Sequence, residues 1–341
     1  MKTKVYLLIV LIFCLGLHGN AQDKTDSTND FFDNEETVVL GKVALEITGE
    51  IQNPGKVDFS KLAKHSVIVK EAVLKNNKDT FVGAYRYDGY SLYDIINLYK
   101  IKDRPNEFNS VINYFLEIEN AKGEKVVVSW GEIYYPNHRH EILVATDVMR
   151  IIPSKTKELW PLPTEPKLVV AGDIVTERNI SSPTKITVRY YPKNIPDKKG
   201  LKPLYSENIK IFDHEKEVAV IKDNPKTNIT ESYPCVFYGR GRGIHGIDKF
   251  KGIKVKDFLV NYFPENIKNF KSGVLLISAP DGFRAVYTYS EIFNRNDQAD
   301  LLLMDVGKTE DGGRFNCFPA GDFFSDRAIR AINEIYFINV K

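Results

Sequence analysis

The most constraining feature of this chain is a pattern of residues that it contains twice. An Ala-Gly-Asp triplet, an arginine five positions after the Asp and alternating apolar residues beyond it occupy residues 171–188. The same pattern returns 149 residues later, at 320–337. Upstream echoes keep their order while the offset drifts to 159 and then 163, as loop insertions in a duplicated unit would produce. The sequence therefore predicts two copies of one domain, at 43–190 and 208–341, each large enough to bury its own core.

The amino terminus has the pattern of a signal peptide. Lys2 and Lys4 precede an apolar run, and Gly19-Asn20-Ala21 provides small residues for cleavage after Ala21. Lipid attachment at Cys14 is the alternative for this segment. We expect an exported protein, periplasmic or extracellular, in which 1–21 is removed and polar residues 22–42 form a flexible leader. No other apolar run approaches the length of a membrane span, so an integral membrane protein is not expected.

The charge balance argues against a general polyanion binder. Without Lys2 and Lys4 the count of Lys and Arg falls from 47 to 45, equal to the 45 Asp and Glu residues. A net charge of zero does not favour nucleic acid as a partner. The partner that remains open is an unknown protein or a small anionic ligand.

Short alternating segments dominate the secondary-structure pattern. Ser91 is a predicted N-cap for a helix through Leu98, and a second short helix is expected at 254–262. Turn signals at 122–123 and 281–282 predict β-hairpins, and 141–145 reads as a short buried strand. Proline-containing residues 191–207 are the expected linker. Strands with few short helices predict an α+β fold, present in two tandem, mainly β copies.

Several of these segments resemble the molybdopterin-binding domains of the sulfite oxidase family. The likeness is carried in the first copy by 45–54 (LEITGEIQNP) and 87–96 (YDGYSLYDII), and in the second by 278–291 (SAPDGFRAVYTYSE) and 314–321 (RFNCFPAG). It covers most of both copies. The resemblance implies that family's mixed α+β fold, a pyranopterin–molybdenum cofactor and oxygen-atom transfer.

Catalytic members of that family hold molybdenum through a cysteine thiolate, a soft ligand suited to such a metal. The first copy has Glu71-Ala72-Val73-Leu74 in the corresponding region and no cysteine. The second copy offers Cys235, which is the candidate catalytic residue and metal ligand. Cys235 has two other interpretations, a disulfide partner of Cys317 or a small buried side chain.

A glycine-rich loop follows Cys235. Residues 238–247 (YGRGRGIHGI) contain Arg240, Arg242 and His245, and such a loop can surround an anion with backbone N–H groups and guanidinium groups. With Arg314 these residues are the candidate cofactor-binding set of the second copy. The alternative is a bulged hairpin whose arginines are solvated.

A weaker metal site is suggested by Asn137-His138-Arg139-His140-Glu141. On a strand His138 and His140 would share one face and could bind a divalent ion. No third ligand is evident from the sequence, and the alternative is a pair of exposed loop histidines.

Two functions are compatible with these observations. Duplication of the fold without duplication of the cysteine favours an exported, non-catalytic module that binds a ligand or a protein and carries no cofactor. The alternative is an active periplasmic molybdopterin-dependent oxidoreductase of the sulfite oxidase type.

Overall fold

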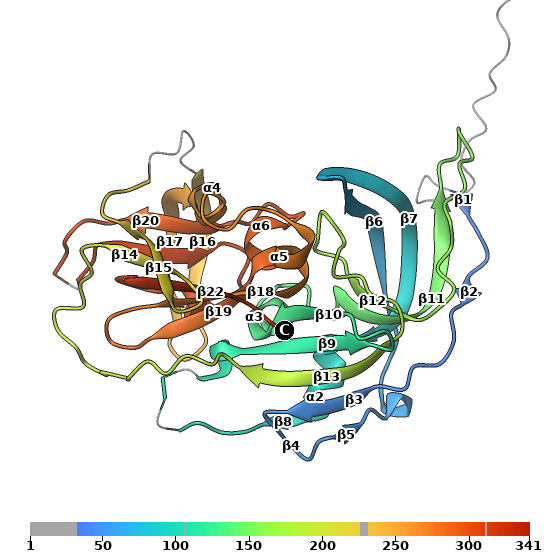
Figure 1. Ribbon diagram of the computed structural model, residues 1–341, viewed down its shortest axis with the longest axis horizontal. Coiled ribbons are helices and arrows are strands. Elements are labelled where there is room, and N and C mark those ends of the chain that lie inside the picture. Colours follow the sequence, from blue (N-terminus) through green and yellow to red (C-terminus); the bar gives the residue numbers. More distant parts are fainter. Residues whose placement is uncertain (1–32, 106, 109, 226–230, 311) are drawn as a thin grey trace, which may run out of the picture.

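The computed structural model describes residues 33–341 except 106, 109, 226–230 and 311 (Figure 1). The expected signal peptide and the first part of the expected leader lie outside the described residues. Among the residues that are described, no helix has both the length and the apolar character needed to cross a membrane.

The structure corrects the expected fold class. The chain is mostly β, with 46% strand and 12% helix, and four small sheets form a β-propeller-like arrangement. The expectation of an α+β fold made of two tandem sulfite-oxidase-like domains is therefore wrong. The reason lies in the lengths of the elements. Helix α2 (Leu92–Asn97) and helix α4 (Val255–Leu259) each end after little more than one turn, whereas strand β7 (Lys78–Ser91) runs for 14 residues.

Two sheets are built mainly from the first half of the chain. The strand order of one is β10-β9-β13-β3-β5, and that of the other is β1-β11-β7-β6, with β2 and β12 on β11; β4 and β8 form a separate pair. Their bounds are β1 Asp33–Asn34, β2 Val38–Val39, β3 Glu46–Gly49, β4 Ile51–Gln52, β5 Gly55–Lys56, β6 His65–Lys75, β8 Lys100–Ile101, β9 Tyr114–Asn120, β10 Lys125–Ser129, β11 Ile142–Ile152, β12 Lys167–Val170 and β13 Pro183–Tyr190.

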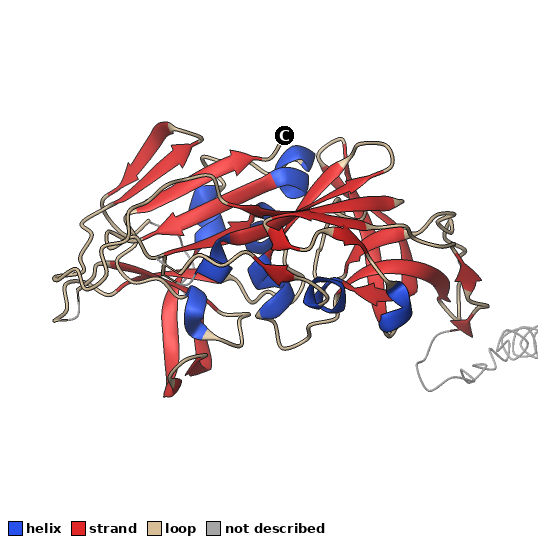
Figure 2. Cartoon of the chain, turned by 90° about the horizontal axis from the view of Figure 1, so that it is seen from below, coloured by secondary structure: helices blue, strands red, loops and turns tan. Residues whose placement is uncertain are grey.

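Two further sheets come from the second half, in the orders β15-β14-β22-β18-β19 and β16-β17-β20-β21. Their bounds are β14 Ile209–Asp213, β15 Lys216–Ile221, β16 Glu231–Gly239, β17 Gly243–Lys254, β18 Gly273–Ser278, β19 Arg284–Thr288, β20 Leu301–Asp305, β21 Phe315–Pro319 and β22 Glu334–Asn339. The remaining helices are α3 Trp130–Tyr134, α5 Ile267–Ser272 and α6 Tyr289–Phe293, with 3-10 turns η1 Phe59–Lys61, η2 Ser110–Asn113 and η3 Ser325–Arg327. Figure 2 shows most of these short helices near the middle of the molecule.

The pairing of strands recurs between the halves. Strand β3 runs parallel to β13 as β14 does to β22, and hairpin β9–β10 corresponds to β18–β19. The order β6-β7-β11-β12 corresponds to β16-β17-β20-β21. The register of the strands agrees as well. Val144 corresponds to Leu303 and Leu168 corresponds to Cys317, and each pair is directly opposed across its ladder, Val144 to Leu168 and Leu303 to Cys317. Positions in the two halves can therefore be compared through their strand partners.

The two halves share an apolar interface. Phe115 and Val127 from β9 and β10 belong to one buried cluster with Val274, Leu276 and Val286 from β18 and β19. In Figure 1 these two pairs of strands lie beside one another at the centre of the molecule. Burial of about 25 cal/mol per Å² of apolar surface makes such a cluster a main source of adhesion between the halves.

Candidate functional site

Both cysteines of the described chain are free thiols. Cys235 lies on β16 and is half-buried, while Cys317 on β21 is buried. Burial raises the pKa of the Cys235 thiol, and burial raises the pKa of Cys317 to about 12. Both thiols are therefore protonated at neutral pH, and the structure does not pair them in a disulfide.

The basic candidates of the second half do not converge on Cys235. Arg240 lies in the turn between β16 and β17, with its Nε 3.5 Å from a carboxylate oxygen of Asp326. Arg242 is exposed in the same turn, and the His245 ring on β17 lies against Phe237 with centroids 5.3 Å apart. The loop is thus the bulged end of a hairpin.

Arg314 lies elsewhere and is already paired. Its guanidinium bonds both carboxylate oxygens of Asp305 and donates to the carbonyl of Lys222. A molybdenum cofactor needs a thiolate beside converging basic groups. Arg240 lies beside Asp326, His245 lies against Phe237 and Arg314 is paired with Asp305, so these side chains do not surround Cys235 and do not fit that requirement.

The strand register identifies which residues of the second half correspond to Glu71 and its neighbours in the first half. In the first half Glu71 faces Gly83 across a bulge, and in the second Phe237 faces Gly246 across a bulge at the same point. By the same comparison, Phe250 stands at the position of Tyr87 and Asn316 at that of Lys167.

In the first half, the position around Glu71 is filled by polar side chains. The buried Glu71 carboxylate accepts hydrogen bonds from Lys167 Nζ at 2.7 and 2.8 Å, from Tyr87 Oη at 3.0 Å and from Asn179 Nδ2 at 2.9 Å. Each partner comes from a different element. The site is a closed ion pair with its hydrogen bonds made, as a buried charge requires.

The first half also covers this sheet face with its own chain. Residues 153–166, between β11 and β12, place Trp160 and Leu162 on the cluster around Tyr85. The Trp160 indole donates to the carbonyl of Ile151 at 2.9 Å, and Tyr85 Oη donates to the carbonyl of Pro161 at 2.6 Å. The corresponding connection of the second half, 306–314, is shorter.

In the second half the same place is a cavity of about 310 Å³. Its apolar wall comprises Phe237, Phe250, Met304 and Phe318, with the rings of Phe250 and Phe318 stacked at 4.1 Å between centroids. Arg330 lies at the wall with an exposed side chain. Replacement of the buried Glu71 group by aromatic residues, together with the shorter covering loop, opens the cavity. The sequence predicted none of these residues as a site, because the cavity depends on strand register.

A second cluster lies in the first half. His65 opens β6, Asp94 lies in the first turn of α2, and His140 lies in the loop before β11. His65 Nε2 is 2.7 Å and His140 Nδ1 is 3.7 Å from Asp94 Oδ2, and the two imidazole rings stack at 3.8 Å between centroids. Burial and the neighbouring His65 lower the pKa of His140.

The structure therefore does not place His138 with His140 in one candidate site; His140 lies with His65 and Asp94 instead. His138 and His140 lie in a loop rather than on a strand, and His138 is outside the cluster. The two further members, His65 and Asp94, come from segments far away in the sequence. Spacing along the chain gave no signal for them.

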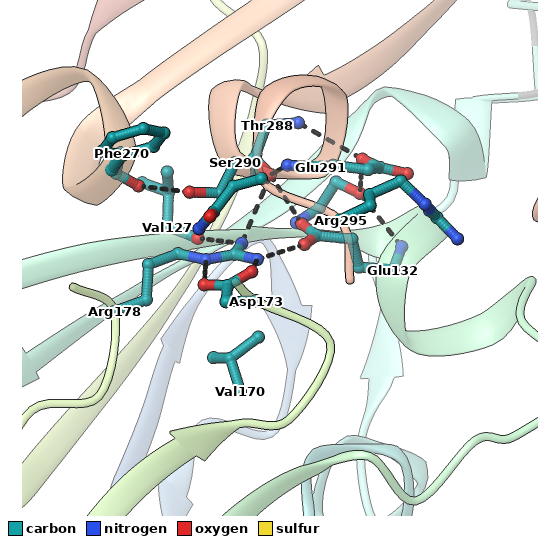
Figure 3. A network of polar contacts seen from close by, with 12 residues as sticks. Val127, Glu132, Val170, Asp173, Arg178, Phe270, Thr288, Ser290, Glu291 and Arg295 are labelled. Carbon is teal, nitrogen blue, oxygen red and sulfur yellow. Dashed lines mark hydrogen bonds and ion pairs between the residues drawn. The ribbon is translucent and has the colours of Figure 1, made fainter. Parts of the chain in front are cut away.

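Two fully buried arginines and their polar partners lie between the halves (Figure 3). The Arg178 guanidinium contacts both carboxylate oxygens of Asp173, at 2.8 and 2.6 Å, and Glu132 Oε1 at 2.7 Å. In the second half, Arg327 contacts Asp322 at 2.7 and 2.6 Å and Glu291 at 2.5 Å. These are the arginines of the repeated pattern.

Two hydrogen bonds connect the Arg178 cluster of the first half with the Arg327 cluster of the second half. Ser129 Oγ donates to Glu291 at 2.7 Å, and Thr288 Oγ1 donates to Glu132 at 2.8 Å. Ser129 and Thr288 also cap α3 and α6 in capping boxes with these glutamates. We define this set of residues, with the two Asp-Arg pairs, as the central network.

Electrostatics in the central network follows from burial. Desolvation raises the pKa of Asp173 to about 6, against the opposing effect of Arg178. Desolvation also acts to raise the pKa of Glu132, but Arg178 outweighs it and holds that pKa below its ordinary value. Desolvation raises the pKa of Glu291. Every carboxylate here is committed to an arginine, so the arrangement joins the halves and leaves no free base.

Comparisons with known proteins add no family to these observations. No family model matches the chain, and no curated protein matches it.

Proposed function

We propose that this protein is an exported, non-catalytic binding module whose ligand occupies the cavity of the second half. The carrying observation is that Phe237, Phe250 and Asn316 surround a void of about 310 Å³ where the first half has a closed Glu71–Lys167 ion pair. This volume lies at the lower end of the roughly 300–1,000 Å³ typical of small-molecule sites. The ligand is therefore a small organic molecule rather than a folded partner.

The lining defines the chemistry of that ligand. Stacked Phe250 and Phe318, with Phe237 and Met304, provide an apolar and aromatic surface. Arg330 provides a guanidinium, and no ion pair of it with another described residue is observed. A carboxylate or sulfonate fits a guanidinium fork well. We therefore assign the ligand class as a small amphipathic monoanion with an aromatic or aliphatic body.

Support for binding rather than catalysis comes from the reactive groups. Burial raises the pKa of the Cys235 thiol, which keeps it protonated. The glutamates of the central network are paired with Arg178 and Arg327. Stoichiometric molybdenum in protein purified from a cofactor-competent host, lost on Cys235→Ser, would overturn this interpretation.

The binding test uses 1-anilinonaphthalene-8-sulfonate as the fluorescent probe and 4-phenylbutyrate as its competitor. We expect saturable binding of one probe per chain. Ala328→Leu adds bulk at the cavity wall and should abolish binding. Arg330→Gln removes one charge-assisted interaction worth roughly 1–2 kcal/mol, so affinity should fall about 5- to 30-fold.

Arg240→Gln is the matched control, since this exposed arginine is outside the cavity lining. Circular dichroism establishes that each variant is folded. Equal probe binding by the wild type, Ala328→Leu and Arg330→Gln would place the probe elsewhere and refute the proposed site.

Export is tested separately by intact-mass measurement of protein recovered from the periplasm or medium. We expect a mature chain that begins at Gln22, with residues 1–21 removed. Retention of 1–21, or a lipid on Cys14, would contradict this part of the proposal.

A further inference from the structure

We infer that His65, Asp94 and His140 form a binding site for a divalent transition-metal ion such as Zn²⁺. The site lies in the first half and shares no residue with the cavity of the second half. Two imidazoles and one carboxylate are a ligand set that Zn²⁺ uses, with a fourth position left for water.

Three separate elements bring these side chains together. His65 is the first residue of β6, where it pairs across the ladder with Gly89 of β7. Asp94 is fixed in the first turn of α2, because its backbone N–H donates to Ser91 Oγ at 3.1 Å. His140 arrives from the loop between α3 and β11. The ligands are thus presented by a strand, a helix and a loop that already pack together.

The distances are close to those that an ion requires. One ligand atom from each residue lies within 4.8 Å of the other two. Ligands bound at about 2.1 Å in a tetrahedron are about 3.4 Å apart. The His65–Asp94 distance of 2.7 Å is shorter than this and the His140–Asp94 distance of 3.7 Å is slightly longer. The ligand atoms of the two imidazoles lie within 4.8 Å of each other, so their separation has to change by at most about 1.4 Å to reach coordination geometry.

Ring orientation is the main adjustment needed. The two imidazoles are nearly parallel, at 5°, so they must tilt for both lone pairs to meet at one point. Partial exposure leaves room for this, since the side chains of His65, Asp94 and His140 are 27%, 25% and 41% exposed.

The Ser91 hydroxyl is a present hydrogen-bond partner of His140 Nδ1, the ring atom that faces Asp94. Ser91 Oγ accepts from the N–H of Asp94, so its own hydrogen is available to His140 Nδ1 at 3.0 Å. In the tautomer in which Nδ1 accepts this hydrogen bond, its one lone pair is shared with the Ser91 hydroxyl, so an ion bound at Nδ1 would replace that hydrogen bond.

Access is provided by an adjoining surface pocket of about 580 Å³. It is lined by His140 together with Ser66, His138, Glu141 and Asn296. Water can reach the open coordination position from this side. Arg139 also lines the pocket, and its guanidinium donates to Tyr93 Oη at 2.9 Å.

The experiment is a calorimetric titration of the purified mature chain with ZnCl₂, accompanied by visible spectroscopy with CoCl₂. We expect one ion per chain and the ligand-field bands of a low-coordinate cobalt site. His140→Gln and Asp94→Asn should each weaken binding at least about 10-fold, the scale on which changes at a metal site act.

His214→Gln is the matched control, because His214 also pairs with an aspartate, Asp213 at 2.8 Å, but lies in the other half. His138→Gln tests the neighbouring histidine of the pocket. Loss of binding in His140→Gln and Asp94→Asn, with retention in both controls, supports the site. Absence of stoichiometric binding to the wild type, undiminished binding by His140→Gln, or loss of binding in His214→Gln would refute it. Circular dichroism of each variant separates loss of the site from loss of the fold.

Discussion

At the scale of single residues, the unusual feature is two fully buried arginines. Arg178 and Arg327 are the largest side chains that are almost wholly removed from solvent. Such a charge is tolerated only when it is paired and hydrogen-bonded, and each arginine meets an aspartate of its own half and a capping glutamate. The repeated Asp-to-Arg spacing is therefore an architectural signal.

Truncation of one buried arginine should be strongly destabilising. Arg178→Ala leaves Asp173 and Glu132 buried without a cation, so the free energy of unfolding should fall by about 3–5 kcal/mol. Lys61→Ala removes an exposed pair with Asp58 and should leave the free energy of unfolding almost unchanged. Urea denaturation measures both values. Equal losses in the two variants would contradict the role assigned to Arg178.

The raised pKa of Asp173, about 6, predicts a pH dependence of stability. The folded state holds this proton where the unfolded chain has released it, so the stabilising contribution is lost as pH rises through about 6. Between pH 5 and 7 the wild type should lose about 1 kcal/mol more than Asp173→Asn. Urea denaturation of both proteins at the two pH values gives this difference, and identical changes would contradict the assignment.

At the scale of elements, the capping boxes of α3 and α6 also connect the halves. Ser129 and Thr288 each satisfy the first turn of their own helix and donate to the glutamate of the other helix. Close packing between α3 and Arg327 leaves no space for a larger side chain at Gly131. A Cβ added at Gly131 in α3 would lie 2.0 Å from Arg327 Nη1.

Thr288→Val tests this double role with little change of shape. It removes the α6 cap and the bond to Glu132, and the free energy of unfolding should fall by about 1–3 kcal/mol. Thr184→Val, in which an exposed hydroxyl is lost, is the control and should change stability by less than about 0.5 kcal/mol. Thermal and urea denaturation supply the values, and a neutral Thr288→Val would show that the cross-half bond contributes nothing.

At the scale of the whole molecule, the central network and the buried apolar cluster that contains Phe115 and Leu276 hold the two halves together. The two tryptophans of the chain, Trp130 and Trp160, both lie in the first half, so their fluorescence reports on that half. Far-ultraviolet circular dichroism reports on both halves. The packing predicts that the two signals change together.

We therefore expect coincident unfolding midpoints from fluorescence and circular dichroism in urea. In Arg178→Ala the coupling is weakened, and a separation of the two midpoints is expected. A circular dichroism transition in the wild type that continues after the fluorescence transition is complete would show that the halves unfold independently.

Local patterns were sufficient for several elements. Ser91 caps α2 as its hydrogen-bonding chemistry predicted, and the turn at 122–123 joins β9 to β10. Lengths were less well predicted: the strand expected at 141–145 extends as β11 to Ile152. The expected α+β class failed for the same reason, since tertiary pairing extended strands beyond their local signals.

What the sequence by itself determined is the order of strands, the helix caps and the repeated Asp-Arg pattern, because these depend on residues close together in the chain. Only the tertiary structure decided which distant groups meet. The cluster of His65, Asp94 and His140, the bond from Thr288 to Glu132 and the cavity beside Phe237 all depend on strand register and loop length. A shift of one residue in a strand turns a side chain to the opposite face, so such sites exist only once the sheets have formed.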